Sequence, residues 1–441
     1  MRATLAATGA CAVLAVAALT SSGAAATAPP AWWLRALDAD GLVAPGPGKP
    51  VTIVDTGLDF AHPEFSGRPG TIPLDRQQIT SPDDFHGTAI SSLVGARGVR
   101  VRGLYPRALL NEWDASERDG LTLASIVDGI DAASRAGPGV INLSFGSAAD
   151  VPALQEAILR ALRAGSVVVA AAGDSRGFDF SPYPGEYPHV VTVGATDRRG
   201  RAAPFSSPSS AIDVAAPGVG VEVAVPASRD PSGYSSASGT SYSAALVSAA
   251  LAWIWTRRPE LDATQLVALV RRTARRPGGA FSNATGWGVL DLRAALRAPA
   301  PPPDPSEPND DVALVEPGRT FERGAPLLTA PGRRRATVRA RVDQNEDPAD
   351  VYRALVPPHG VLRVTADAQA GDVALRVWGP DTPTILERGG RERRDLLAGG
   401  TRGRHQTAEA RNGGAAAEVV YVDVSAGVSR TASYTLRLET S

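Results

Sequence analysis

Cysteine is almost missing from this chain of 441 residues, because Cys11 is the only one. It lies in an apolar N-terminal segment that we expect to be removed on export. The mature chain would then contain no thiol, which excludes disulfides, a cysteine nucleophile and a thiolate metal site. We therefore expect a fold held together by packing, with or without bound ions.

A surplus of charge of either sign is missing as well. The formal net charge is -1 and the isoelectric point is about 6.6, so nothing favours nucleic acid or an anionic membrane as a partner. Zinc, phosphate-loop and dinucleotide-binding signatures are also absent from the sequence. We expect a monomer with no nucleic-acid partner and no stable membrane insertion.

Long hydrophobic runs are few. Arg2, an apolar run over residues 10–19 and small residues at 24–28 are typical of a secretory signal peptide, which we predict over residues 1–28. The run is shorter than the roughly 20 residues that span a bilayer, so we favour export and cleavage over a membrane anchor. The protein would then be extracellular or associated with the cell envelope. A second apolar run, 241–256, is also too short and predicts a buried central helix.

Apolar strands alternate with helical patterns from residue 50 to residue 297. Strands are predicted at 51–54, 140–143, 167–171 and 190–193, and helices at 89–94, 121–134, 151–163, 241–256 and 262–275. This alternation is typical of a parallel sheet with helices on both faces. We therefore predict an α/β domain over residues 29–297.

The pattern changes beyond residue 297. Residues 298–308 (APAPPPDPSEP) predict a semi-rigid, proline-rich linker. Residues 309–441 predict a small all-β sandwich, because apolar and polar residues alternate at 336–342, 360–366, 372–378, 418–424 and 434–438. The charged, glycine-rich stretch 388–404 predicts a mobile loop.

Three short segments place Asp55, His86 and Ser241 beside glycine or small residues, in that chain order. A serine hydroxyl needs a base to take its proton and a carboxylate to orient that base. Each residue alone has a plainer explanation: DTG is also an aspartic-protease signature, a single histidine is more often a capping or surface residue, and a single serine is more often a helix cap. The joint pattern favours a catalytic triad.

These segments resemble those of the subtilisin-like serine peptidases, over most of residues 31–297. They are VTIVDTGLDFAHPEF, FHGTAISSLV and SGTSYSAA, with weaker matches at VINLSFGS, VVVAAAGD, YPHVVTVGATD, DVAAPGV and GWGVLDLRAAL. The resemblance implies a subtilisin-like α/β fold, with a parallel sheet and helices on both faces, followed here by the small all-β sandwich. It also implies hydrolysis of peptide bonds in proteins or peptides.

The resemblance assigns roles residue by residue. Ser241 would be the nucleophile, His86 the general base and later the general acid, and Asp55 the residue that orients His86. Ser144, Phe145 and Gly146 would form the strand that pairs with substrate and lines the pocket for the P1 side chain, which precedes the scissile bond.

Asp174 departs from the family pattern, in which an asparagine donates a hydrogen bond to the oxyanion. Losing one such donor costs on the order of 10²–10³ in rate, and an ionised carboxylate would also repel the oxyanion. Three interpretations remain open: a protonated Asp174 that works at acid pH, an oxyanion hole made of the Ser241 N–H and the Thr240 side chain, or a site that only binds peptides.

Calcium is the one cofactor that the sequence leaves open. Subtilisins with a calcium loop after the catalytic histidine are a little longer there, and this chain has Arg97, Arg100 and Arg102 instead of oxygen ligands. We carry no metal site over to that loop. Near the linker, oxygen ligands for a structural calcium ion are available on Glu307, Asn309, Asp310 and Asp311, and a solvated acidic linker is the alternative.

Residues 305–440 resemble the bacterial pre-peptidase C-terminal domain, through SEPND, DPADVYRAL and SYTLRL among other pieces. The resemblance implies binding of substrate or of a surface, or help in secretion, and an inert stabilising module is the alternative. For the whole chain we predict a secreted serine endopeptidase. The rival is a secreted peptide-binding protein with the same fold, favoured by Asp174, and an esterase is a third option.

Overall fold

The computed structural model describes residues 31–76, 84–117, 120–175, 182–276, 279–385 and 395–441. The predicted signal peptide, residues 1–28, lies outside these ranges. The chain divides into two compact units, Met1–Pro301 and Pro302–Ser441. The division falls inside the stretch 298–308 that we predicted to be a linker, and the end of that stretch packs with the C-terminal unit.

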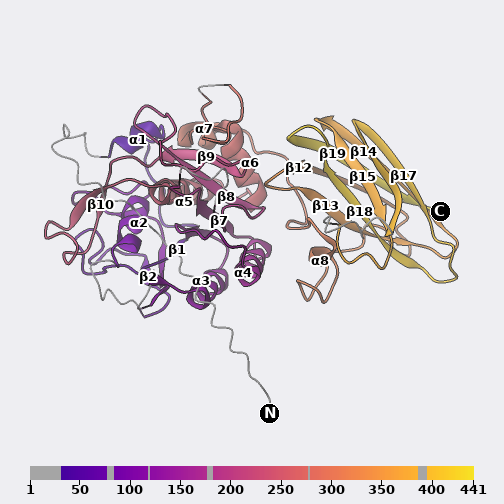
Figure 1. Ribbon diagram of the computed structural model, residues 1–441, viewed down its shortest axis with the longest axis horizontal. Helices are drawn as coiled ribbons and strands as arrows, with labels where there is room; N and C mark the ends of the chain where they lie inside the picture. The colour runs from indigo at the N-terminus through magenta and orange to yellow at the C-terminus, as the bar shows by residue number, and fades with distance from the viewer. Residues whose placement is uncertain (1–30, 77–83, 118–119, 176–181, 277–278, 386–394) are drawn as a thin grey trace, which may run out of the picture. The chain divides into compact units, whose positions relative to one another are not determined.

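The N-terminal unit is built on a parallel sheet (Figure 1). Within the described residues its strand order is β2-β3-β1-β6-β7-β8-β9, and every neighbouring pair is parallel. These strands are β1 (Val51–Asp55), β2 (Thr71–Pro73), β3 (Leu110–Asp114), β6 (Val140–Leu143), β7 (Val167–Ala171), β8 (Val190–Thr196) and β9 (Ile212–Pro217). Short ribbons pair β4 (Ser116–Glu117) with β5 (Gly120–Leu121) and β10 (Val221–Ala224) with β11 (Tyr234–Ala237).

Helices cover both faces of this sheet. They are α1 (Trp32–Ala36), α2 (His86–Gly95), α3 (Leu123–Arg135), α4 (Pro152–Arg163), α5 (Thr240–Arg257), α6 (Ala263–Thr273) and α7 (Leu292–Arg297). Alternate strand residues face opposite sides, so Val51 and Ile53 join the core beneath α2 and α5, whereas Val54 joins the core beneath α3 and α4. Figure 1 shows α3 and α4 side by side. The predicted α/β class with helices on both faces is confirmed.

The helices α6 and α5 begin in different ways. Asp262 accepts a hydrogen bond from the Gln265 N–H, and the Gln265 side chain accepts one from the Asp262 N–H, which completes the capping box ahead of α6. Helix α5 has no such side-chain cap and is stabilised by burial instead, because Tyr242 to Trp255 are all buried. The sequence indicated both helices from their apolar patterns.

The C-terminal unit consists of two four-stranded antiparallel sheets around a common apolar core. Their orders are β12-β19-β14-β17 and β13-β18-β15-β16. The elements are α8 (Val312–Val315), β12 (Arg335–Asp343), β13 (Ala349–Val356), β14 (Val361–Ala370), β15 (Val373–Trp378), β16 (Leu396–Gly403), β17 (His405–Arg411), β18 (Glu418–Ala426) and β19 (Thr431–Thr440). The predicted sandwich is consistent with this architecture.

The loop predicted over 388–404 is wrong in its second half. Leu396–Gly403 is strand β16, which pairs with β15 through a register that shifts in two places. Gly399 has a φ of 94°, a left-handed conformation that favours glycine. Glycines therefore adapt an irregular strand here, where the sequence suggested a loop. Residues 386–394 lie outside the described part of the chain.

Candidate active site

Asp55 and His86 are joined by a hydrogen bond at the carboxyl end of β1. His86 Nδ1 lies 2.9 Å from Asp55 Oδ1 and 3.0 Å from Oδ2, and both residues are buried. A carboxylate only accepts, so Nδ1 carries the proton and Nε2 keeps its lone pair. Burial disfavours the charged imidazolium, but the charge and hydrogen bond of Asp55, with a contribution from Asp174, outweigh it and raise the pKa of His86.

Close contact between the aspartate and histidine segments explains why these residues neighbour glycine and threonine. A Cβ atom on Gly87 would lie 2.3 Å from the Gly57 carbonyl oxygen, so only glycine fits. The Gly87 N–H donates to Thr56 Oγ1 over 3.0 Å, and the Asp59 N–H donates to Thr88 Oγ1 over 2.9 Å. The segments therefore hold the start of α2 against the end of β1, which fixes the two functional side chains.

Ser241 is the second residue of α5 and is half-buried. Its Oγ donates a hydrogen bond of 2.9 Å to the Ser144 carbonyl oxygen. His86 Nε2 is buried and has no hydrogen-bond partner among the described residues. The His86 ring packs against Tyr242, the neighbour of Ser241, with ring centroids 5.9 Å apart. The lone pair of His86 is thus available at the N-terminus of α5.

Ser144 is anchored by a buried polar network that sequence reasoning missed. Its Oγ lies 2.8 Å from Asn142 Oδ1 and 3.1 Å from the Ser241 carbonyl oxygen, and Asn142 Nδ2 donates to Ser248 Oγ over 3.0 Å. The signal was a polar residue in an otherwise apolar strand and another in an apolar helix. The network ties the segment of Ser144, Phe145 and Gly146, which follows β6, to α5.

Asp174 follows β7 and faces the N-terminus of α5. Its Oδ1 accepts hydrogen bonds of 2.8 Å from both the N–H and the hydroxyl of Thr240. The same Thr240 hydroxyl accepts from the Gly173 N–H over 3.0 Å. Burial raises the pKa of Asp174, although the hydrogen bonds from Thr240 and the positive charge of a protonated His86 oppose this. The Thr240 hydroxyl is engaged with Asp174, a pairing that sequence reasoning did not foresee.

Residues 46–288 match the sequence model of the subtilase family. The chain belongs to the subtilase family. It is 32% identical over 255 residues to Subtilisin BL of Lederbergia lenta, covering 57% of this chain and 92% of that protein. It is 32% identical over 258 residues to Subtilisin DY of Bacillus licheniformis, covering 57% and 92%.

Solved structures show the same fold. Fervidolysin from Fervidobacterium pennivorans, described as a keratinolytic enzyme related to subtilisin, aligns with a TM-score of 0.54 at 20% identity, covering 86% of this chain and 69% of that chain. Membership of the family makes this subtilase a serine endopeptidase, which acts on proteins or peptides. In the described residues, no helix combines the length and the apolar character needed to cross a membrane.

The segment that follows α2 in this subtilase is built around a buried carboxylate. Glu64 accepts four backbone N–H groups: those of Gly98 and Val99 reach Oε2 at 3.0 Å each, and those of Arg100 and Val101 reach Oε1 at 2.6 and 2.8 Å. Converging N–H groups bind an anion and repel a cation. The Glu64 carboxylate thus organises this loop by accepting its backbone N–H groups.

Proposed function

We propose that this chain is a secreted serine endopeptidase that cleaves peptide bonds through an acyl-enzyme on Ser241. The observation that carries the proposal is the buried hydrogen bond between Asp55 and His86, which leaves the Nε2 lone pair available beside the first turn of α5. A base in the right tautomer is what the serine hydroxyl needs to become a nucleophile, and the helix N-terminus favours the negative charge that develops there.

The reaction has two halves. Ser241 Oγ leaves its hydrogen bond with Ser144 and attacks the substrate carbonyl carbon, while His86 Nε2 takes the hydroxyl proton. His86 then gives this proton to the leaving amine, and the C–N bond breaks. In the second half a water molecule attacks the acyl-enzyme, with His86 again first base and then acid. Asp55 holds the Nδ1 proton and stabilises the imidazolium throughout.

Asp174 acts, in this proposal, as an oxyanion donor in its protonated form. With Oδ1 accepting from Thr240, a proton on the other oxygen supplies the hydrogen bond that the family's asparagine would give. The Ser241 N–H supplies the second donor. Thr240 positions Asp174 rather than donating to the oxyanion itself. The raised pKa of Asp174 increases the protonated fraction at mildly acid pH.

Substrate would lie along Ser144, Phe145 and Gly146 as an added strand, which uses main-chain hydrogen bonds and therefore accepts many sequences. The predicted signal peptide and the extracellular character of the family support a location outside the cell. For the C-terminal unit, we propose a role in binding substrate or a surface, because its sheets suit the domain that the sequence resembles.

A peptide-binding protein without catalysis is the rival function, and two observations favour it. An ionised Asp174 at the oxyanion site would oppose the reaction, and Ser241 Oγ donates to Ser144 rather than to His86. The two functions differ in whether Ser241 becomes a nucleophile.

Covalent labelling separates them. We expect phenylmethanesulfonyl fluoride to add one sulfonyl group, found by mass spectrometry on the peptide that contains Ser241. The Ser241→Ala chain should stay unlabelled, whereas a control in which exposed Ser236 is replaced by alanine should label normally. Absence of label on Ser241 at every pH from 5 to 9 would support the peptide-binding function instead.

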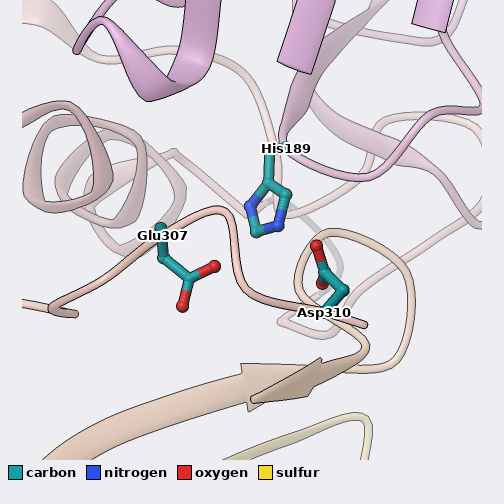
Figure 2. Close-up of side chains that lie close together, drawn as sticks. All are labelled: His189, Glu307 and Asp310. Atoms are coloured by element: carbon teal, nitrogen blue, oxygen red, sulfur yellow. The ribbon is translucent and has the colours of Figure 1, made fainter. Parts of the chain in front are cut away.

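We also propose that the C-terminal unit binds a calcium ion with the carboxylates of Asp304, Glu307 and Asp347. One oxygen from each of the three lies within 4.8 Å of the others. Asp347 Oδ1 is buried and has no hydrogen-bond partner among the described residues, so an oxygen-seeking cation fits the cluster. Figure 2 shows two of the predicted ligands, Glu307 and Asp310, on the segment that leads to α8. Asp311, also predicted, instead accepts the N–H groups of Val312 and Ile385.

The stability of the C-terminal unit should depend on pH in opposite directions with and without calcium. Burial, and then the charges of neighbouring carboxylates, raise the pKa values of Glu307 and Asp347 well above normal; burial raises the pKa of Asp350 to about 6. Without calcium, the folded state binds protons more tightly than the unfolded chain, so stability should fall as pH rises from about 4 through 6 and beyond. Calcium needs deprotonated ligands, so its stabilisation should grow over the same range.

At pH 7.5, calcium at about 100 times its Kd should raise the melting temperature of the C-terminal unit by about 5–10 °C. The measurement is calorimetry of the full chain carrying Ser241→Ala, which prevents self-digestion. Asp347→Asn should remove most of the calcium response, and the exposed Asp381→Asn should keep it. An equal response in all three chains would place the calcium elsewhere.

A further inference from the structure

Two glycines follow neighbouring strands at the nucleophile. Gly146 comes after β6 and Gly173 comes after β7, and these parallel strands pair through Leu143 and Ala170. Both segments contact the first turn of α5: the Ser144 carbonyl accepts from Ser241 Oγ, and the Gly173 N–H donates to Thr240 Oγ1. Under the proposed function, the scissile carbonyl lies at Ser241, so the P1 side chain enters between the two segments.

The ring of Pro182 occupies the space between these glycines. A Cβ atom on Gly146 would lie 2.5 Å from Pro182 Cγ, and one on Gly173 would lie 2.6 Å from Cδ and 3.0 Å from Cγ. Such distances are well below ordinary van der Waals contact, so both glycine backbones already touch the same ring. The two glycines thus accommodate proline where they would otherwise leave room for a substrate side chain.

Pro182 is also held in place by the backbone around it. Ser147 and Tyr183 exchange two hydrogen bonds of 2.8 Å each, and the Gly185 N–H donates to the Pro182 carbonyl oxygen over 2.8 Å. A proline ring has no rotamer that would swing it out of the way, because it is closed onto its own backbone nitrogen. A large P1 side chain could enter only by displacing this anchored segment.

We infer that Pro182 shortens the P1 pocket and restricts the enzyme to substrates with alanine or glycine before the scissile bond. This inference rests on the proposed function for the position of the scissile carbonyl. Because a large P1 side chain would have to displace the anchored ring, we expect kcat/KM to be at least about tenfold higher for alanine than for phenylalanine at P1. Pro182 is a specificity-determining residue that sequence reasoning did not single out.

The test compares p-nitroanilide peptides that differ only at P1, succinyl-Ala-Ala-Pro-Ala and succinyl-Ala-Ala-Pro-Phe. The wild-type chain should cleave the alanine substrate with a kcat/KM at least ten times that of the phenylalanine substrate. Pro182→Ala should raise kcat/KM for phenylalanine at least tenfold and change that for alanine by less than threefold. Pro182→Val, which removes the ring constraint but keeps the bulk, should retain the alanine preference.

Equal cleavage of both peptides by the wild-type chain would overturn the inference without contradicting the proposed peptidase activity. A binding experiment tests the inference even if the chain does not hydrolyse peptides. The matching uncleaved acids are titrated calorimetrically into Ser241→Ala chains with and without Pro182→Ala. Tighter binding of the alanine peptide, lost in the Pro182→Ala chain, would support the filled pocket even if no hydrolysis occurs. Binding that ignores the P1 residue in both chains would refute it.

Discussion

Replacing Ser241 or His86 with alanine is expected to lower kcat by about 10⁶, and replacing both should lower it no further. The reason is that the two side chains act in one proton transfer: without the base the hydroxyl stays a poor nucleophile, and without the hydroxyl the base has nothing to activate. The measurement is kcat on a good alanine peptide for the two single variants and the double variant.

Melting curves of all chains show whether the variants fold, and Ser236→Ala serves as the matched control because Ser236 is exposed on β11. Additive losses, in which the double variant falls well below either single variant, would mean that Ser241 and His86 act independently. That outcome would contradict the triad even if each variant alone were slow.

Replacing Asp174 with asparagine is expected to raise kcat/KM at pH 8 to 9 by about 10²–10³. An asparagine Oδ1 can keep the hydrogen bonds from the Thr240 N–H and hydroxyl, while its amide donates to the oxyanion at any pH. Above its raised pKa, the native aspartate is an anion and can only accept. The substitution therefore exchanges a repulsive group for a donor.

The effect of Asp174→Asn should depend on pH. Activity needs a neutral His86, and protonation of His86, whose pKa is raised, should lower it at acid pH. Activity also needs a protonated Asp174, so in the wild-type chain it should be low at alkaline pH, where Asp174 is ionised. The Asp174→Asn chain should lose only the falling limb and reach a plateau. The gain should therefore shrink towards acid pH.

Asp174→Ala is the control, because it removes both the negative charge and the donor. It should fall between the other two chains at alkaline pH and below the wild-type chain at pH 5. A falling limb that persists in the Asp174→Asn chain would assign that limb to another group. Equal activity of all three chains at every pH would show that Asp174 does not contact the oxyanion.

Much of the fold followed from local patterns. Strands such as Val167–Ala171 are recognised as short apolar runs near glycines, because a strand covered on both faces has no polar side. The family and the fold class are confirmed. Strand β16 was missed since its glycines and register shifts hide the alternation on which recognition depends. Strands β13 and β17 were not predicted as separate elements either.

The sequence by itself determined which reactive residues are present. They are Asp55, His86 and Ser241 in one chain order and an aspartate at position 174, with no thiol beyond Cys11. These residue types and their order are read directly from the sequence. The reason for the glycines beside them, the close approach of Gly57 and Gly87, came from the structure.

Only the tertiary structure decided how the site is completed. The engagement of Thr240 with Asp174, and the ring of Pro182 between Gly146 and Gly173, join residues that are far apart along the chain. These placements depend on the pairing of β6 with β7 and on the backbone hydrogen bonds between Ser147 and Tyr183. No local sequence pattern predicts these contacts, because which side chains meet is set by how the strands and the segments after them pack together.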